Sequence, residues 1–230
     1  MHGYGAAMSR EAFAGLVGDG RAEVPLDETS LAIAGALRGP VDEVEWLAVL
    51  DQIAADCPTP TADGIARHLV DQLAFEGNER NYYDWRNSCL DHVLALRTGI
   101  PITLAVVMIE VGRRLGVPLV GIGMPSHFLV GVPGEDTFFD LFNGSAPIDA
   151  AGAKDLFAAL TGGRVPWDDA FLHATSERQI VIRMLNNLRS IFVGNHDELR
   201  LAIVMQLRAA LPELQSREVH EIDNATAMLN

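Results

Sequence analysis

Cysteine and long apolar runs are both scarce in this chain, and each shortage narrows the class of protein. The two cysteines among the 230 residues, Cys57 and Cys89, form neither a disulfide framework nor a zinc signature, so we interpret them as reduced thiols. No apolar run reaches the roughly 18 residues of a membrane-spanning helix. The first residues lack the basic and apolar regions of a signal peptide. We therefore expect a soluble, cytoplasmic protein that does not act at a membrane.

Positive charge is scarce as well. The chain has 17 Lys plus Arg against 31 Asp plus Glu, which gives a net charge of −14, and Lys154 is its only lysine. Such an acidic balance argues against nucleic acid or anionic lipid as the main partner. Hydrophobic residues make up 49% of the chain, which is enough for the core of one domain, with or without an appended module.

The first half of the chain is patterned mainly for helices. Residues 1–25 are rich in glycine and weakly patterned, so we expect a loosely ordered segment there. Beyond it, apolar residues recur at helical spacing. Ser88 and Asp91 resemble a capping box. The pattern predicts helices over residues 27–37, 41–56, 62–75, 88–96 and 102–115.

After Leu115 the apolar period shortens towards two, which is typical of strands. We expect strands over 118–123, 127–132 and 137–142, the last two joined by the turn at 133–136. A short helix over 153–160 follows. Ser176 with Gln179, and Asn195 with Glu198, then resemble capping boxes of two further helices that end at Pro212. Together these two helices have about the length of one tetratricopeptide unit.

His127 and Asp140 are the main candidate catalytic residues. They lie on neighbouring predicted strands, as the base and its orienting acid do in a Cys-His-Asp triad. The cysteine should stand at the start of the 102–115 helix, where the helix dipole and the imidazole would stabilise a thiolate. The chain instead has Ile102 and Thr103. The simplest interpretation is a buried hydrogen-bonded pair that joins two strands without catalysing acyl transfer.

Two other residues are candidate nucleophiles. Thr103 carries a hydroxyl at the helix start, although capping is the commoner role for such a threonine. Cys89 lies in the first turn of the preceding predicted helix, where a thiolate would also be favoured, although a free cysteine is more often a small buried hydrophobe. We expect no metal and no cofactor, because the histidines and acids show no metal-ligand spacing.

The segment Gly77–Asn87 combines aromatic and amide side chains, and we expect it to line a cleft beside His127. Its aromatic residues offer apolar area with polar tips, and its asparagines offer paired donors and acceptors. The alternative is a connection whose asparagines bind their own backbone and whose aromatics fill the core. The candidate binding residues are Asn78, Tyr82, Tyr83, Trp85, Asn87, Ser88 and Ser126.

An ordered series of motifs gives the chain a resemblance to a known family. The motifs are Tyr82-Tyr83, Asn87-Ser88, Val93-Leu94, Arg97, the run Gly-Ile-Pro-Ile-Thr-Leu from Gly99, the run Pro-Ser-His-Phe-Leu-Val from Pro125, and Arg183–Leu188. With them the chain resembles the bacterial transglutaminase-like proteins of the SirB type, over roughly Leu26 to Leu211. Two departures are Ser126, where the family commonly has glycine, and Gly131, where an arginine is usual.

The resemblance implies an α+β fold with a papain-like, transglutaminase-like core. Residues 26–172 would form this core, with a helical N-terminal half, a central helix and a small antiparallel sheet. Residues 173–230 would form tetratricopeptide-like helices packed on it. His127 and Asp140 take the histidine and aspartate positions of the family, and its cysteine position falls on Ile102 or Thr103.

Two classes of function remain open. In the first, the protein is a pseudo-enzyme whose cleft holds a peptide or small amide without cleaving it, and whose C-terminal helices bind a protein partner. In the second, it is an acyl transferase or amide hydrolase that uses Thr103 or Cys89 with His127 and Asp140. The sequence predicts neither the substrate nor the oligomeric state.

Overall fold

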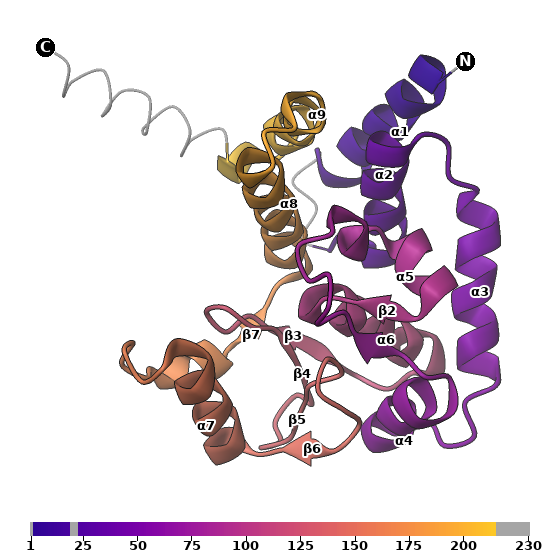
Figure 1. The fold of residues 1–230 in the computed structure, drawn as a ribbon. Coiled ribbons are helices and arrows are strands. Elements are labelled where there is room, and N and C mark those ends of the chain that lie inside the picture. The colour runs from indigo at the N-terminus through magenta and orange to yellow at the C-terminus, as the bar shows by residue number, and fades with distance from the viewer. Residues whose placement is uncertain (1, 19–22, 215–230) are drawn as a thin grey trace, which may run out of the picture.

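The computed structural model describes residues 2–18 and 23–214. Helices dominate the N-terminal half (Figure 1). They are α1 (His2–Val17), α2 (Leu26–Arg38), α3 (Glu43–Ala55), α4 (Ala62–Arg67) with a π-helical turn (His68–Gln72), a 3-10 turn (Trp85–Ser88), α5 (Leu90–Leu96) and α6 (Pro101–Leu115). The predicted helices over 27–37, 41–56 and 102–115 are confirmed as α2, α3 and α6.

The prediction of a loosely ordered N-terminal segment is wrong for α1. Phe13 and Val17 are fully buried, and the helix packs against α2. Tertiary packing stabilises this helix although its glycines give it a weak intrinsic preference. Residues 19–22 of the predicted segment lie outside the described residues, as do residues 215–230 of the predicted C-terminal part.

Helix α6 is the centre of the molecule. Pro101 stands at its first turn, where the missing N–H costs nothing, and Gly116 ends it with a left-handed φ of 71°. Every residue from 101 to 112 is buried, because α3, α4 and α5 pack on one side of the helix and strands β3 and β4 pack on the other. The start of α6 is therefore held rigidly from several directions.

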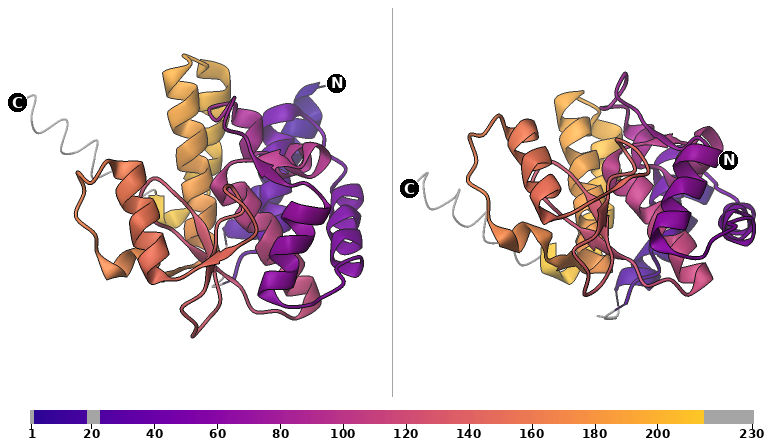
Figure 2. Two further views of the ribbon diagram at one scale, coloured as in Figure 1. Left: turned by 60° about the horizontal axis from the view of Figure 1, so that its bottom comes forward. Right: turned by 90° about the horizontal axis from the view of Figure 1, so that it is seen from below.

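A five-stranded antiparallel sheet covers α6, in the order β6-β5-β4-β3-β7. Its strands are β3 (Val120–Ile122), β4 (Leu129–Gly131), β5 (Phe138–Phe139), β6 (Pro147–Ile148) and β7 (Ala174–Thr175). Val130 pairs with Phe139, and both belong to the core around α6. Leu129 and Phe138 belong to a second cluster, which includes Ala153 of α7 (Ala150–Thr161), so α7 lies on the other side of the sheet (Figure 2).

The three predicted strands are confirmed in shorter form. Strands β6 and β7 were not predicted, and neither was the parallel pair β1 (Glu76–Gly77) and β2 (Thr98–Gly99). Each has two residues, which is too short to show an alternating pattern.

The C-terminal helices α8 (Glu177–Gly194) and α9 (Glu198–Ala209) form a pair that packs on α1 and α2. The hydrophobic core is continuous from Phe13 to Leu214. The capping box of Ser176 and Gln179 is confirmed, but the other two predicted boxes are wrong. Asp197 caps α9, and Ser88 lies within a 3-10 turn, where its buried hydroxyl has no hydrogen-bond partner.

A buried ionic network joins α2 to α6. Asp27 and Glu110 are each 2% exposed, and Arg114 donates to both carboxylates, at 2.8 and 2.9 Å. Burial raises the pKa of Glu110 to about 6 despite the neighbouring Arg113. Burial also opposes ionisation of Asp27, but hydrogen bonds from Arg114 and from a backbone amide lower its pKa. The pair therefore carries opposite pKa shifts in one site.

Candidate functional site

His127 and Asp140 form a buried pair at one end of the neighbouring strands β4 and β5. The two side chains are joined by a 2.8 Å contact between Nε2 of His127 and Oδ2 of Asp140, and the residues are 5% and 7% exposed. Oδ2 also accepts from the Asn143 amide at 2.6 Å, and Oδ1 accepts from the Phe142 backbone at 3.2 Å. Where the Asp140 carboxylate accepts, Nε2 of His127 donates this hydrogen bond, and Nδ1 is the ring nitrogen left for other partners.

A strained turn carries the histidine. Ser126 adopts a left-handed φ of 66°, a conformation that favours glycine, and it does so at the position where the resembling family commonly has glycine. Arg183 of α8 fixes this turn, because its Nη2 donates to the carbonyls of Met124 and His127, both at 2.6 Å. Its guanidinium also lies 5.4 Å from the Phe128 ring centre. The imidazole is therefore positioned from α8 as well as from the sheet.

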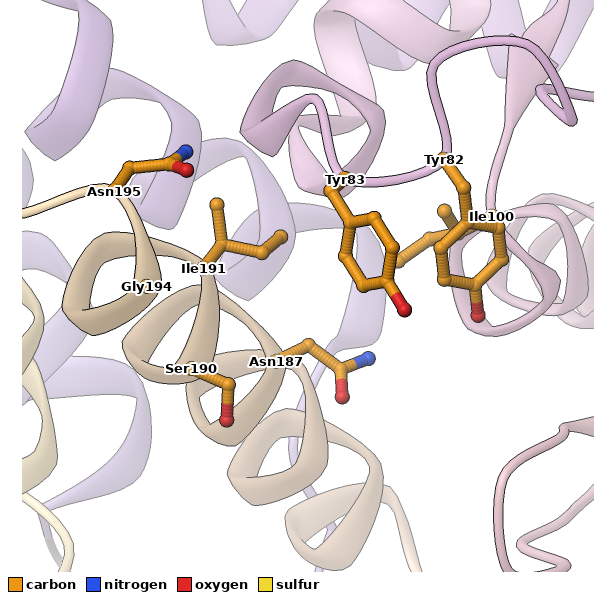
Figure 3. A pocket seen from close by; sticks show the side chains of 8 residues that line it. All are labelled: Tyr82, Tyr83, Ile100, Asn187, Ser190, Ile191, Gly194 and Asn195. Carbon is orange, nitrogen blue, oxygen red and sulfur yellow. The ribbon is translucent and has the colours of Figure 1, made fainter.

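Two adjoining pockets form a cleft along one side of α8. The smaller one has a volume of about 200 Å³ and lies beside His127. The larger one has a volume of about 380 Å³ and lies between Tyr83 and Ile191. Tyr82, Ile100 and Asn187 line both pockets. We call the two pockets together the His127 cleft. In Figure 3 the Tyr83 side chain points from its loop towards Asn187 of α8, and Tyr82 lies next to it on the side of Ile100.

At the start of α6, Ile102 and Thr103 face different surroundings. Ile102 lines the smaller pocket together with His127. The Thr103 hydroxyl is fully buried and donates to the Asn87 carbonyl at 2.5 Å. It lies within 3.3 Å of the Ile100 carbonyl as well. Ile102 is thus a lining residue of the cleft, whereas the Thr103 hydroxyl is turned to the Asn87 carbonyl.

The other candidate nucleophile, Cys89, lies outside the His127 cleft. It is 0% exposed and is the residue preceding α5. Burial raises the pKa of its thiol, so the neutral form dominates at physiological pH. Cys57 is a second buried free thiol. Among the described residues, the structure therefore brings His127 and Asp140 together but brings neither Thr103 nor Cys89 into the cleft with them.

Of the candidate binding residues, Tyr82, Tyr83 and Ser126 line the cleft. Tyr82 is half-buried, and burial raises the pKa of its phenol. Its ring contacts Tyr83 at 5.3 Å and Phe142 at 5.8 Å between ring centres. Phe142 in turn meets the His127 ring edge-on at 6.2 Å. This aromatic row connects the exposed Tyr83 to the buried imidazole.

The remaining candidate binding residues support the loop from behind. Asn78 donates to the Asn87 side chain at 2.9 Å, and Asn87 donates to the Asn81 carbonyl at 2.8 Å. Trp85 packs against Phe192 of α8 at 6.0 Å between ring centres. Asn78, Trp85, Asn87 and Ser88 do not line either described pocket. Their contacts fix the position of Tyr82 and Tyr83 rather than the surface of the cleft.

Helix α8 contributes a wall of the cleft that its sequence pattern does not predict. Arg183, Asn187 and Ile191 lie four residues apart and share one face of the helix. In the sequence, the motif Arg183–Leu188 supports only the family resemblance. Helical periodicity alone did not show which face of α8 would meet the Tyr82 loop.

None of the helices in the described ranges combines the length and apolarity needed to span a membrane. No three His, Cys, Asp or Glu side chains within those ranges gather closely enough to share a metal ion.

The chain is similar in sequence to several known proteins. A UPF0162 protein of Xylella fastidiosa is 42% identical over 137 residues, which cover 57% of this chain and 49% of that protein. A UPF0162 protein of Pseudomonas aeruginosa is 32% identical over 130 residues, covering 56% and 47%. F-box only protein 21 of Mus musculus is 47% identical over 68 residues, covering 30% and 11%.

The matched region spans about half the length of these UPF0162 relatives. No solved structure matches the chain significantly. The family model of the transglutaminase-like superfamily matches residues 36–186, a range that includes α6, the sheet, His127 and Asp140. The chain therefore belongs to the transglutaminase-like superfamily and has its α+β fold.

Proposed function

We propose that this protein is a non-catalytic binding module that holds a peptide or small amide in the His127 cleft. One observation carries the proposal: the residues of the α6 start that line the cleft with His127 are Pro101 and Ile102, and neither side chain carries a nucleophile. Triad chemistry needs a hydroxyl or thiol within hydrogen-bond reach of the imidazole, and isoleucine has neither. The His127–Asp140 pair then acts as a fixed polar group of the cleft wall.

The lining of the cleft suits a peptide or amide. Tyr82 and Asn187, which line both pockets, offer donors and acceptors for a peptide backbone. Tyr83 and Ile191 offer apolar surface in the larger pocket. Sites that bind small molecules commonly combine apolar walls with a few fixed polar groups in this way.

The alternative function is acyl transfer or amide hydrolysis by Thr103 or Cys89 with His127 and Asp140. The intact His127–Asp140 contact favours it. However, the Thr103 hydroxyl donates to the Asn87 carbonyl, and Cys89 is sealed in the core. Either nucleophile would need the start of α6 or the Tyr82 loop to rearrange, so we rank the enzyme below the binding module.

We further propose that the chain is of the SirB type, with tetratricopeptide-like helices that bind a protein partner. The α8–α9 pair follows the core where that arrangement requires it. A cytoplasmic location would suit the two free, buried cysteines.

Affinity selection with mass-spectrometric readout tests the binding proposal. The probes are pools of N-acetylated tetrapeptides that end either in a carboxylate or in a carboxamide. Ser190→Trp places an indole in the larger pocket, which Ser190 lines. Arg189→Trp is the matched control, because Arg189 is exposed on the same helix and lines neither described pocket.

We expect the wild type and Arg189→Trp to retain peptides that Ser190→Trp does not retain. Thr103→Ala should bind like the wild type, and the peptides should be recovered intact. Retention of no pool by the wild type would refute the proposal. Peptide products that disappear in His127→Ala would establish the enzyme instead.

A further inference from the structure

The guanidinium of Arg183 has hydrogen-bond donors that its contacts within the described protein do not use. Its Nη2 donates to the two carbonyls of the histidine turn. The Nε and Nη1 hydrogens have no hydrogen-bond partner among the described residues, and no described carboxylate lies within ion-pair distance. Arg183 also lines the smaller pocket. The cleft therefore contains donors of a fixed cation that can reach a ligand.

This cation is poorly solvated. Burial lowers the pKa of Arg183, although a guanidinium remains charged at physiological pH. Arg38 and Arg114, by contrast, each have a carboxylate partner. A half-buried charge without a counter-ion gains more from binding an anion than a solvated one does.

The local charge around Arg183 also favours an anion. None of the described residues that line either pocket is acidic, although the chain as a whole has a net charge of −14. Asp140, the carboxylate behind His127, accepts hydrogen bonds from His127 and Asn143. An anion that enters the cleft would therefore meet hydrogen-bond donors before it meets a carboxylate.

The shape of the cleft indicates an extended ligand with two different ends. On α8 the lining residues are Arg183, Asn187, Ser190, Ile191 and Gly194, which form one stripe of the helix. The spacing from Arg183 to Gly194 corresponds to about 16 Å at 1.5 Å per residue. An extended peptide of about five residues has this length. One end of the stripe is cationic, and the other, beside Tyr83, is largely apolar.

We propose that the His127 cleft selects peptides that carry a carboxylate, which binds Arg183 beside His127, while an apolar side chain lies between Tyr83 and Ile191. This inference rests on the proposed binding function and names its ligand class. The carboxylate can be the peptide C-terminus or the side chain of an acidic residue. Both present the two oxygens that a guanidinium binds.

Three matched pools of N-acetylated tetrapeptides test the inference on the wild-type protein. The first pool has uncharged side chains and a free C-terminal carboxylate, and the second is the same pool as carboxamides. The third is a carboxamide pool with one fixed glutamate. We expect the first pool to bind roughly ten- to a hundredfold more tightly than the second, the range for a charge-assisted hydrogen bond, with the preference weakening as salt rises.

The third pool distinguishes the two sources of the carboxylate. Tight binding of the first pool alone assigns the peptide C-terminus, and tight binding of the third pool alone assigns an acidic side chain. Tight binding of both pools assigns any carboxylate. Equal binding of all three pools would overturn the carboxylate inference and leave the binding function standing. Retention of no pool would overturn the binding function itself.

Arg183→Met tests the residue directly. We expect it to abolish the preference for the acidic pools, whereas Arg189→Met, which removes the same charge from an exposed position of the same helix, should keep it. Circular dichroism and thermal unfolding check that each variant is folded. If Arg183→Met unfolds, the wild-type comparison of acid and amide pools still decides the inference. A folded Arg183→Met that keeps the preference would contradict it.

Discussion

Replacing Ile102 with cysteine should create a reactive thiol in the His127 cleft. Ile102 is the second residue of α6 and lines the smaller pocket together with His127. A thiol there would lie at a helix N-terminus beside an imidazole, and both lower the pKa of a cysteine. The variant therefore tests whether Ile102 occupies the position of the triad nucleophile.

The expected effect can be estimated from the pKa. If the thiol pKa falls from about 8.5 to about 6.5, within the range for activated cysteines, the thiolate fraction at pH 6.5 rises roughly 50-fold. The lower basicity reduces the nucleophilicity about eightfold, so alkylation at pH 6.5 accelerates roughly sixfold. Ile102 is 2% exposed, so the lost side-chain volume should cost about 1.5–2.5 kcal/mol of unfolding free energy.

The assay is the rate of iodoacetamide alkylation from pH 5 to pH 9, followed by intact mass. The wild type gives the background, which should be low because Cys57 and Cys89 are buried and, unlike Ile102, line neither described pocket of the cleft. Thr103→Cys is the matched control, because the Thr103 side chain faces the Asn87 carbonyl. We expect a midpoint about two pH units lower for Ile102→Cys than for Thr103→Cys. Equal midpoints would refute the assignment of Ile102 to the nucleophile position.

Three further predictions concern stability, each measured by denaturant unfolding. Ser126→Gly should raise the unfolding free energy by up to about 1 kcal/mol, because it relieves the left-handed φ of 66°; a loss would contradict this. Gly77→Ala should lower the unfolding free energy by about 1–3 kcal/mol, because a Cβ there would stand 2.5 Å from the Phe142 ring. Gly15→Ala is the control and should not destabilise the protein, because no atom lies within 4 Å of the added Cβ. Burial raises the pKa of Glu110 from 4.5 to about 6, so its protonated form stabilises the fold below pH 4.5. About 2 kcal/mol of unfolding free energy should be lost as the pH rises through 6. Glu110→Gln should remove this dependence of the unfolding free energy on pH.

The central part of the fold could be predicted because its signals are local. Pro101 and Gly116 mark the two ends of α6, and the alternating residues around the 133–136 turn mark β4 and β5. Antiparallel pairing of those strands brings residues on either side of the turn together. His127 and Asp140 lie just beyond the paired residues of these strands, at the same end, and their side chains meet at 2.8 Å.

The features of the fold and the site that could not be predicted from the sequence depend on contacts between distant segments. Helix α1 is stabilised by packing on α2, which its glycine-rich sequence does not reveal. The roles of Asn78 and Asn87 depend on which carbonyls lie nearby after folding. Arg183 reaches the histidine turn across 56 positions of the chain, and no local pattern encodes such a contact.

The fate of the bound peptide tests the central claim most directly. The wild-type protein is incubated with the N-acetylated tetrapeptide carboxylate pool, and both the retained fraction and any products are measured by mass spectrometry. We expect the wild type to retain peptides that Ser190→Trp does not retain, and we expect these peptides to be recovered unchanged. Cleaved or transferred products that form with the wild type and disappear with His127→Ala would contradict it, because they would show that the cleft beside Ile102 is catalytic.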